Sequence, residues 1–245
     1  MCEAMTNGIC YDPANLERLA EIESRHFWFR ARRRIIVDAL GRWFPDARSY
    51  LEIGCGTGFN AGTIARAFPG WSVTMSDPLA LETGPIRQID ALRIPFENEF
   101  DIVGAYDVLE HIEDDRAALA EFRKACRRGG GILLTVPQHG WLWSPSDTCA
   151  SHFRRYESGP LLRMLRECGF EPLGWSSFMT VNLPAIYLRN CFLRGSGRSP
   201  AWKAPIAPIN WLLERGMEAD RRLIRAGWRL PAGASLLVAA RRTDG

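Results

Sequence analysis

The sequence has no long apolar run. No stretch approaches the roughly 20 consecutive apolar residues that a membrane-spanning helix needs. Its first residues, MCEAMTNGICYDP, show neither a basic start nor a long apolar core. We therefore expect no transmembrane span and no secretory signal peptide, and we expect a cytoplasmic protein.

An excess of charge of one sign is also missing. The 31 Lys and Arg residues nearly balance the 28 Asp and Glu residues, which leaves a formal net charge of +3. A dedicated nucleic-acid-binding domain carries a stronger basic excess, so we expect no nucleic-acid partner. The content of 47% hydrophobic and 24% charged residues is globular and excludes disorder, collagen and coiled coil. At about 150 residues per domain, the chain is expected to form a single domain over 1–245.

Recognisable patterns of cysteine chemistry are absent too. The seven cysteines form no CxxC pair, and no Cys/His cluster has zinc spacing. No GxSxG elbow is present, nor a Cys/His pair at a recognised spacing. We expect reduced, mostly buried thiols and no metal site.

What the sequence does contain is an alternation of short apolar strands with amphipathic helices. This alternation predicts an α/β fold with a mainly parallel sheet, to which the last strand is added antiparallel. Helices are expected over 14–44, with a break near His26, and over 60–68 and 159–168. A further helix is expected from Asp114 or Asp115 to about Cys126, with Gly129–Gly131 stopping it. Strands are expected to end at Ile53, Asp77 and Asp107 and to cover 132–136, 171–178 and 234–240.

The connection 179–232 is unusually long and holds nine basic residues against three acidic ones. Apolar residues recur in it at helical spacing beside arginines. One interpretation is a helix packed on the domain or on the second subunit of a homodimer. The other interpretations are a lid, or a surface for peripheral contact with a membrane or with a phosphorylated or lipid-linked substrate.

The strongest local signal is the stretch Leu51-Glu52-Ile53-Gly54-Cys55-Gly56-Thr57-Gly58. It follows a strand and precedes a helix, where open α/β sheets bind ligands, and glycines there permit positive φ and close approach of a ligand. The dinucleotide pattern GxGxxG fails because Phe59 stands at its sixth position, and a P-loop would need a lysine. The pattern that remains is ExGxGxG.

Further stretches follow in order. They are Asp77, Asp90-Ala91, Ile94-Pro95-Phe96, Phe100-Asp101-Ile102-Val103, Asp107-Val108-Leu109-Glu110-His111 and Gly129-Gly130-Gly131-Ile132-Leu133-Leu134. From about 48 to 140 the chain resembles, in register, the class I S-adenosylmethionine (SAM) dependent methyltransferases. Outside this region, ESRHFWFRARRR at 23–34, HFRRY at 152–156 and LPAGASL at 230–236 resemble a bacterial UbiG-like, "type 11" branch.

The resemblance implies a Rossmann-like fold with a mainly parallel seven-stranded sheet and an antiparallel last strand. The SAM-binding core would comprise 48–178 and 233–242, with an N-terminal helical cap at 14–44 and a helical insertion or lid at 179–232. Asp77 and Asp90 are only 13 positions apart, shorter than the family usually shows, so the helix after the second strand is expected to be shortened.

SAM is the cofactor that the resemblance implies. Asp77 would hold the ribose, because a carboxylate accepts hydrogen bonds from two vicinal hydroxyls together. Asp90 and its neighbouring backbone would face the adenine, and Arg30 or Arg34 would pair with the methionine carboxylate. The expected cofactor-binding residues are Glu52, Gly54, Cys55, Gly56, Gly58, Asp77, Asp90, Ala91, Tyr106, Asp107 and His111.

His139 and His152 are the candidate catalytic bases, since both follow the fifth strand expected from the resemblance, at the edge where an acceptor should arrive. Methyl transfer by positioning alone remains open, because an in-line displacement needs a base only for a poor nucleophile. Arg154, Arg155 and Tyr156 are expected either to bind an anionic acceptor or to brace their loop. The aromatic side chains available to line the acceptor site, or to pack in the core or lid, are Trp141, Trp143, Phe178 and Trp202.

The expected function is methyl transfer from SAM to a small molecule, such as a sugar, a lipid-linked compound or a secondary metabolite. A SAM-binding protein without turnover is the alternative. A nucleic-acid or protein methyltransferase is disfavoured, because Tyr106-Asp107-Val108-Leu109 replaces the Asn/Asp-Pro-Pro-Tyr stretch of amino-directed nucleic-acid enzymes.

Overall fold

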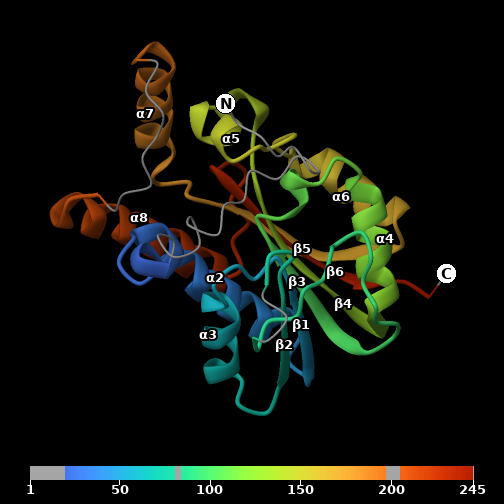
Figure 1. Cartoon of the computed structure of the whole chain (residues 1–245). Helices are drawn as coiled ribbons and strands as arrows, with labels where there is room; N and C mark the ends of the chain where they lie inside the picture. The colour runs from blue at the N-terminus through green and yellow to red at the C-terminus, as the bar shows by residue number, and fades with distance from the viewer. Residues whose placement is uncertain (1–19, 81–83, 197–204, 245) are drawn as a thin grey trace.

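The computed structural model of the chain describes residues 20–80, 84–196 and 205–244, and its centre is a six-stranded sheet (Figure 1). The strand order is β2-β1-β3-β4-β6-β5. Neighbours among the first four strands pair in parallel, whereas β6 is antiparallel to both β4 and β5. The strands are β1 (Ser49–Ile53), β2 (Ser72–Ser76), β3 (Phe100–Tyr106), β4 (Cys126–Pro137), β5 (Phe170–Phe178) and β6 (Ser235–Arg242). The predicted mainly parallel sheet with an antiparallel last strand is confirmed.

The predicted count of seven strands is wrong. Between β2 and Asp90 the described residues contain no helix, and the only pairing there is an isolated parallel bridge between Ser76 and Arg87. A parallel neighbour needs a crossover of a dozen or more residues before its own strand begins. The short interval after Asp77 cannot hold both, so the additional edge strand is reduced to one bridge.

Helices cover both faces of the sheet (Figure 1). They are α2 (Phe27–Trp43), α3 (Phe59–Ala67), α4 (Asp115–Ala125), α5 (Pro145–Cys149), α6 (Ser158–Glu167), α7 (Leu183–Ser196) and α8 (Ala207–Arg225), with 3-10 turns η1 (Leu109–His111) and η2 (Gly140–Leu142). The break near His26 is confirmed, because His26 caps α2 and its Nδ1 accepts a hydrogen bond from the Trp28 amide. Residues 14–19 of the predicted cap and Trp202 lie outside the described residues.

The predicted end of helix α4 at about Cys126 is confirmed, but the role predicted for the glycines after it is wrong. The glycines at 129–131 do not stop α4, which ends at Ala125, but lie inside β4. A Cβ at Gly131 would lie 2.2 Å from the Ala240 carbonyl oxygen. Glycine is therefore needed at this position for the close pairing of β4 with β6.

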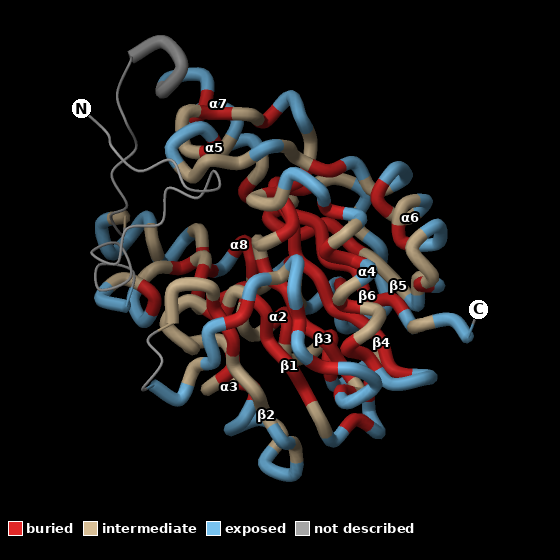
Figure 2. The backbone as a smooth tube through the Cα atoms, turned by 45° about the vertical axis from the view of Figure 1, so that its right-hand side comes forward, coloured by how far each residue is buried: buried red, intermediate tan, exposed pale blue. Residues whose placement is uncertain are grey.

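The core consists of two apolar layers, one on each face of the sheet. The central strands between these layers are largely buried (Figure 2). One layer holds Phe122 of α4 and Leu165 of α6, and the other holds Leu40 of α2 and Met217 of α8. The N-terminal cap and the insertion therefore cover the same face. Among the described residues, no helix combines the length and apolar character needed to cross a membrane.

Candidate functional site

The glycine loop joins β1 to α3 at the carboxyl edge of the parallel strands. Gly54, Gly56 and Gly58 all have positive φ, at 66°, 55° and 79°. A Cβ on Gly54 would lie 2.6 Å from Cγ2 of Val108, and one on Gly58 would lie 3.1 Å from Sδ of Met75. Glycine is thus required for both the backbone path and the close packing at Gly54.

Asp77 follows β2 and lies directly against this loop. Its side chain is buried, with the residue 3% exposed, and its Oδ2 accepts a 2.8 Å hydrogen bond from the Gly56 amide. Its Oδ1 accepts a 3.0 Å hydrogen bond from the Leu79 amide. The structure therefore brings the predicted Asp77 and the glycines into one cradle. Cys55 is tied to the same strand, because its amide donates to the Ser76 carbonyl at 2.9 Å.

A buried polar group underlies the loop on the α2 face. The Tyr50 hydroxyl lies 3.2 Å from Oε2 of Glu52 and 3.0 Å from the Tyr106 hydroxyl. Burial raises the pKa of Glu52 to about 8, although Tyr50 and Arg32 oppose the shift. Burial also raises the pKa values of Tyr50 and Tyr106. Glu52 and Tyr106 are thus buried together through Tyr50, and their predicted role at the cofactor stays a prediction.

Asp107 ends β3 with a positive φ of 57°, and its amide donates to the Thr135 carbonyl. Its Oδ2 accepts a hydrogen bond from Nη1 of the buried Arg32 on α2. Arg30 and Arg34, the residues predicted to pair with the methionine carboxylate of SAM, both pair with Glu214 of α8 in this structure, at 3.3 and 2.7 Å.

The signal for Arg32 was present in the helical pattern. Arg32 is three residues after Phe29 and four before Ile36, and both of these are buried. That spacing places Arg32 on the inward face of α2.

Asp90 and Ala91 lie in an irregular segment after the bridge to β2. Asp90 is exposed, and its Oδ1 accepts a hydrogen bond from the Leu92 amide within its own turn. Their role on the adenine side stays a prediction.

His139 follows β4, also at the carboxyl edge. Its Nδ1 lies 2.8 Å from Oε2 of Glu157, and its ring stacks on Trp141 with centroids 5.3 Å apart. Its Nε2 is buried and has no hydrogen-bond partner within the described residues. Trp141 in turn meets the ring edge of Tyr187 on α7.

The HFRRY stretch braces its own loop, as one of the two predicted alternatives had it. Arg155 pairs with both carboxylate oxygens of Asp147, at 2.8 and 3.0 Å. Arg154 and Tyr156 both contact Oδ2 of Asp115, at 2.9 and 3.0 Å. Arg154, Arg155 and Tyr156 thus bind carboxylates of the protein itself, those of Asp147 and Asp115.

The other aromatic candidates divide between surface and core. Trp141 is exposed, whereas Trp143 donates from Nε1 to the Thr148 hydroxyl. Phe178 is fully buried in the α2 layer and is a core residue.

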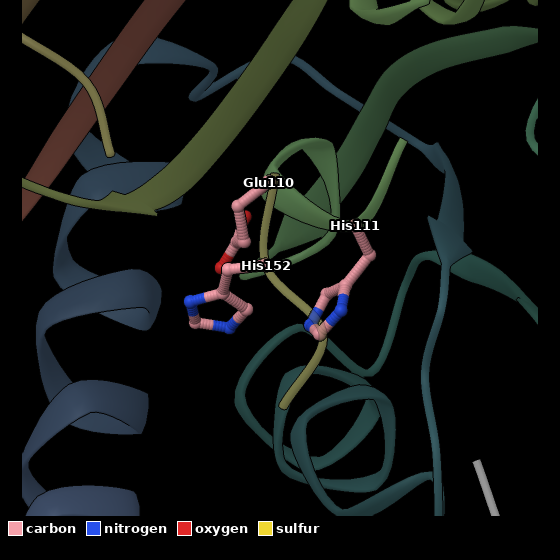
Figure 3. Close-up of side chains that lie close together, drawn as sticks. All are labelled: Glu110, His111 and His152. Carbon is pink, nitrogen blue, oxygen red and sulfur yellow. The ribbon is translucent and has the colours of Figure 1, made fainter. Parts of the chain in front are cut away.

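The side chains of Glu110, His111 and His152 come together in one cluster (Figure 3). One potential metal-ligand atom from each lies within 4.8 Å of the others. Burial raises the pKa of Glu110 to about 8. Burial, and the neighbouring His152, lower the pKa of His111 to about 4. Spacing along the sequence did not indicate this cluster, because His152 reaches it from a distant loop.

The family of the chain follows from comparison with known proteins. A family model described as a methyltransferase domain matches residues 24–179. The chain belongs to this methyltransferase family. The match contains the whole glycine cradle, Asp77 and the Glu110–His152 region. The predicted class I methyltransferase is thereby confirmed, and SAM is the cofactor of this family.

Relatives with lower sequence identity are also methyltransferases by name. A probable SAM-dependent methyltransferase from Mycolicibacterium smegmatis is 26% identical over 160 residues, which cover 61% of this chain and 62% of that protein. The chain thus spans less than two thirds of the length of the curated relatives it matches.

Solved structures show the same fold. The [4+2]-cyclase SpnF has a TM-score of 0.59 at 18% identity, covering 99% of this chain and 88% of that one. The N-methyltransferase NodS from Bradyrhizobium japonicum, in complex with S-adenosylhomocysteine, has a TM-score of 0.53 at 17% identity, covering 98% and 100%. At these identities the likeness concerns the fold alone.

Proposed function

We propose that this chain transfers a methyl group from SAM to a small-molecule acceptor. The observation that carries the proposal is the cradle of three positive-φ glycines closed by the buried carboxylate of Asp77. Such a cradle fits SAM, because the loop leaves backbone exposed to a ligand and Asp77 retains acceptor capacity for two hydroxyls.

The residues assigned to the cofactor would act at different levels. Gly54, Gly56, Gly58 and Cys55 would form the wall of its site, and Asp77 would hold the ribose. Glu52, Tyr106 and Asp107 would support that wall, Asp90 and Ala91 would border the adenine, and His111 would lie near the reacting end. When bound, SAM supplies a methyl group on a sulfonium, and the protein must hold donor and acceptor in line with water excluded.

His139 is the candidate base that the geometry favours. The carboxylate of Glu157 can only accept, so a neutral His139 carries its proton on Nδ1. Its buried Nε2 is then an acceptor for the proton of an acceptor hydroxyl or amine. Trp141 and Tyr187 beside it give the acceptor an aromatic boundary formed partly by the insertion.

Asp77→Asn tests the cofactor assignment. Calorimetric titration with S-adenosylhomocysteine should show binding weakened about 10- to 100-fold, because charge-assisted hydrogen bonds contribute about 1.5–3 kcal/mol. The exposed Asp46→Asn is the matched control and should bind normally. Unchanged affinity in Asp77→Asn would contradict the assignment.

Turnover separates an enzyme from a binding protein. With methyl-labelled SAM and pools of hydroxylated and amino small molecules, the wild type should form S-adenosylhomocysteine and a labelled product. His139→Gln should bind SAM normally and lose most of the rate. Binding without any product would favour the alternative of a SAM-binding protein.

A further inference from the structure

The Glu110, His111 and His152 cluster lies next to the cofactor cradle, not in a remote part of the fold. Glu110 and His111 belong to η1, which follows β3 at the carboxyl edge of the sheet. Val108, two residues before Glu110, packs so tightly on Gly54 that a Cβ there would meet it at 2.6 Å. A ligand held by this cluster would therefore border the reacting region.

Glu110 is buried without a hydrogen-bond partner among the other described residues, and of these only the charges of Arg32 and Arg155 favour its ionised form. It is 0% exposed, and neither carboxylate oxygen receives a hydrogen bond from another described residue. A buried carboxylate without a partner is costly, and coordination of a metal cation would offset that cost. Arg32, the nearby buried cation, already pairs with Asp107.

Both histidines are oriented by hydrogen bonds away from the cluster. His152 Nδ1 donates to Oδ1 of Asp147 at 3.0 Å, and Asp147 is held in turn by Arg155. His111 hydrogen-bonds to the backbone of Ala150. A carboxylate or carbonyl on one ring nitrogen is the usual arrangement around a metal-ligating histidine, because it fixes the ring and strengthens the other nitrogen as a ligand.

We propose that Glu110, His111 and His152 bind one divalent transition-metal ion, in contrast to the sequence-based prediction of no metal site. Two imidazoles and one carboxylate favour ions such as Zn²⁺, Mn²⁺, Fe²⁺ or Co²⁺ over Mg²⁺ and Ca²⁺. Three protein ligands leave coordination positions open. An oxygen atom of the methyl acceptor occupies one of these open positions, so the acceptor is a hydroxyl compound. This part of the inference rests on the proposed function.

The test uses Co²⁺ as the probe on tag-free, chelator-stripped protein. We expect one equivalent of Co²⁺ per chain, a visible d–d absorption band, and displacement by Zn²⁺. Asp147→Asn removes the hydrogen-bond partner of His152 and should weaken Co²⁺ binding ~10–100-fold. Glu110→Gln and His152→Asn remove a metal ligand itself and should weaken Co²⁺ binding more than that. His139→Asn is the matched control, since it removes an imidazole outside the cluster, and it should bind Co²⁺ as the wild type does.

Circular dichroism establishes that each variant is folded. If folded wild type binds no Co²⁺, or if Glu110→Gln and His152→Asn bind it as the wild type does, the metal site is refuted. Acetohydroxamate, an oxygen-donor probe, should shift the Co²⁺ band, and an unchanged band would overturn the open-position part. Titration of the same samples with S-adenosylhomocysteine tests the proposed function separately, because neither measurement depends on the other.

Discussion

At the scale of single residues, Glu52 shows how a motif position can serve the fold. It is the acidic residue of ExGxGxG, yet it is buried between the sheet and α2 beside Tyr50 and Tyr106. Arg32 is the nearby positive charge, and Glu23 is a second acid that disfavours ionisation of Glu52. A carboxyl in such a place is more stable neutral than charged.

We predict that Glu52 makes stability depend on pH. Its folded pKa of about 8 lies above its ordinary value of 4.5, so its contribution to stability is complete below about 4.5 and is lost as pH rises through about 8. Between pH ~5 and ~8, the free energy of unfolding of the wild type should fall relative to Glu52→Gln, by at most about 1.4 kcal/mol per pH unit. Urea unfolding of both proteins measures this difference. A difference that stays constant with pH would contradict the prediction.

At the scale of elements, the insertion is closed at its base. The Thr180 hydroxyl donates to the Ala232 carbonyl at 2.6 Å, which joins the start of the segment 179–232 to its end. Asp220 of α8, which is 0% exposed, accepts hydrogen bonds from the amides of Thr180 and Val181 at 2.8 and 3.4 Å. This closure explains how so long a connection leaves β5 and β6 paired.

Asp220→Ala should therefore destabilise the protein by about 1 kcal/mol or more, because it removes the acceptor of two part-buried backbone hydrogen bonds. Asp220→Asn keeps one carbonyl oxygen in place and should cost less. Urea unfolding gives the energies, and hydrogen exchange at Thr180 and Val181 locates the effect. Equal losses in the two variants would show that these hydrogen bonds are not the cause.

At the scale of the whole molecule, the two added segments form one layer over the sheet. Arg34 and Arg221 join α2 to α8 through Glu214 and Asp38, at 2.7 and 2.8 Å. The outer face of α8 carries apolar and basic side chains together, and Trp211 and Leu212 are 59% and 63% exposed. Arg215 lies over the Trp211 ring. An outward face of this composition suits an anionic lipid surface.

We predict that the protein binds vesicles containing phosphatidylglycerol more strongly than neutral vesicles. The double variant Trp211→Ser, Leu212→Ser should weaken co-sedimentation at least about tenfold, because each side chain gains about 1.5 kcal/mol or more on leaving water. Leu92→Ser removes an exposed apolar side chain outside the insertion and is the control. If the double variant instead changes the sedimentation coefficient without vesicles, the face joins two copies of the chain.

The parallel sheet, its antiparallel last strand and the glycine loop can all be predicted from the amino-acid sequence. These follow from local patterns: apolar runs that alternate with helices, and glycines placed directly after a strand. The lack of CxxC and zinc spacing among the seven cysteines, and the balanced charge, can likewise be read from the sequence alone.

Which side chains meet depends on the folded chain and could not be predicted from the sequence. The fold paired Arg32 of α2 with Asp107 at the end of β3, and it reduced the additional edge strand to a bridge at Ser76. It also brought His152 to Glu110 and His111. The physical reason is that the parallel strands all end at one edge of the sheet, so loops distant in sequence share a small volume that no local pattern describes.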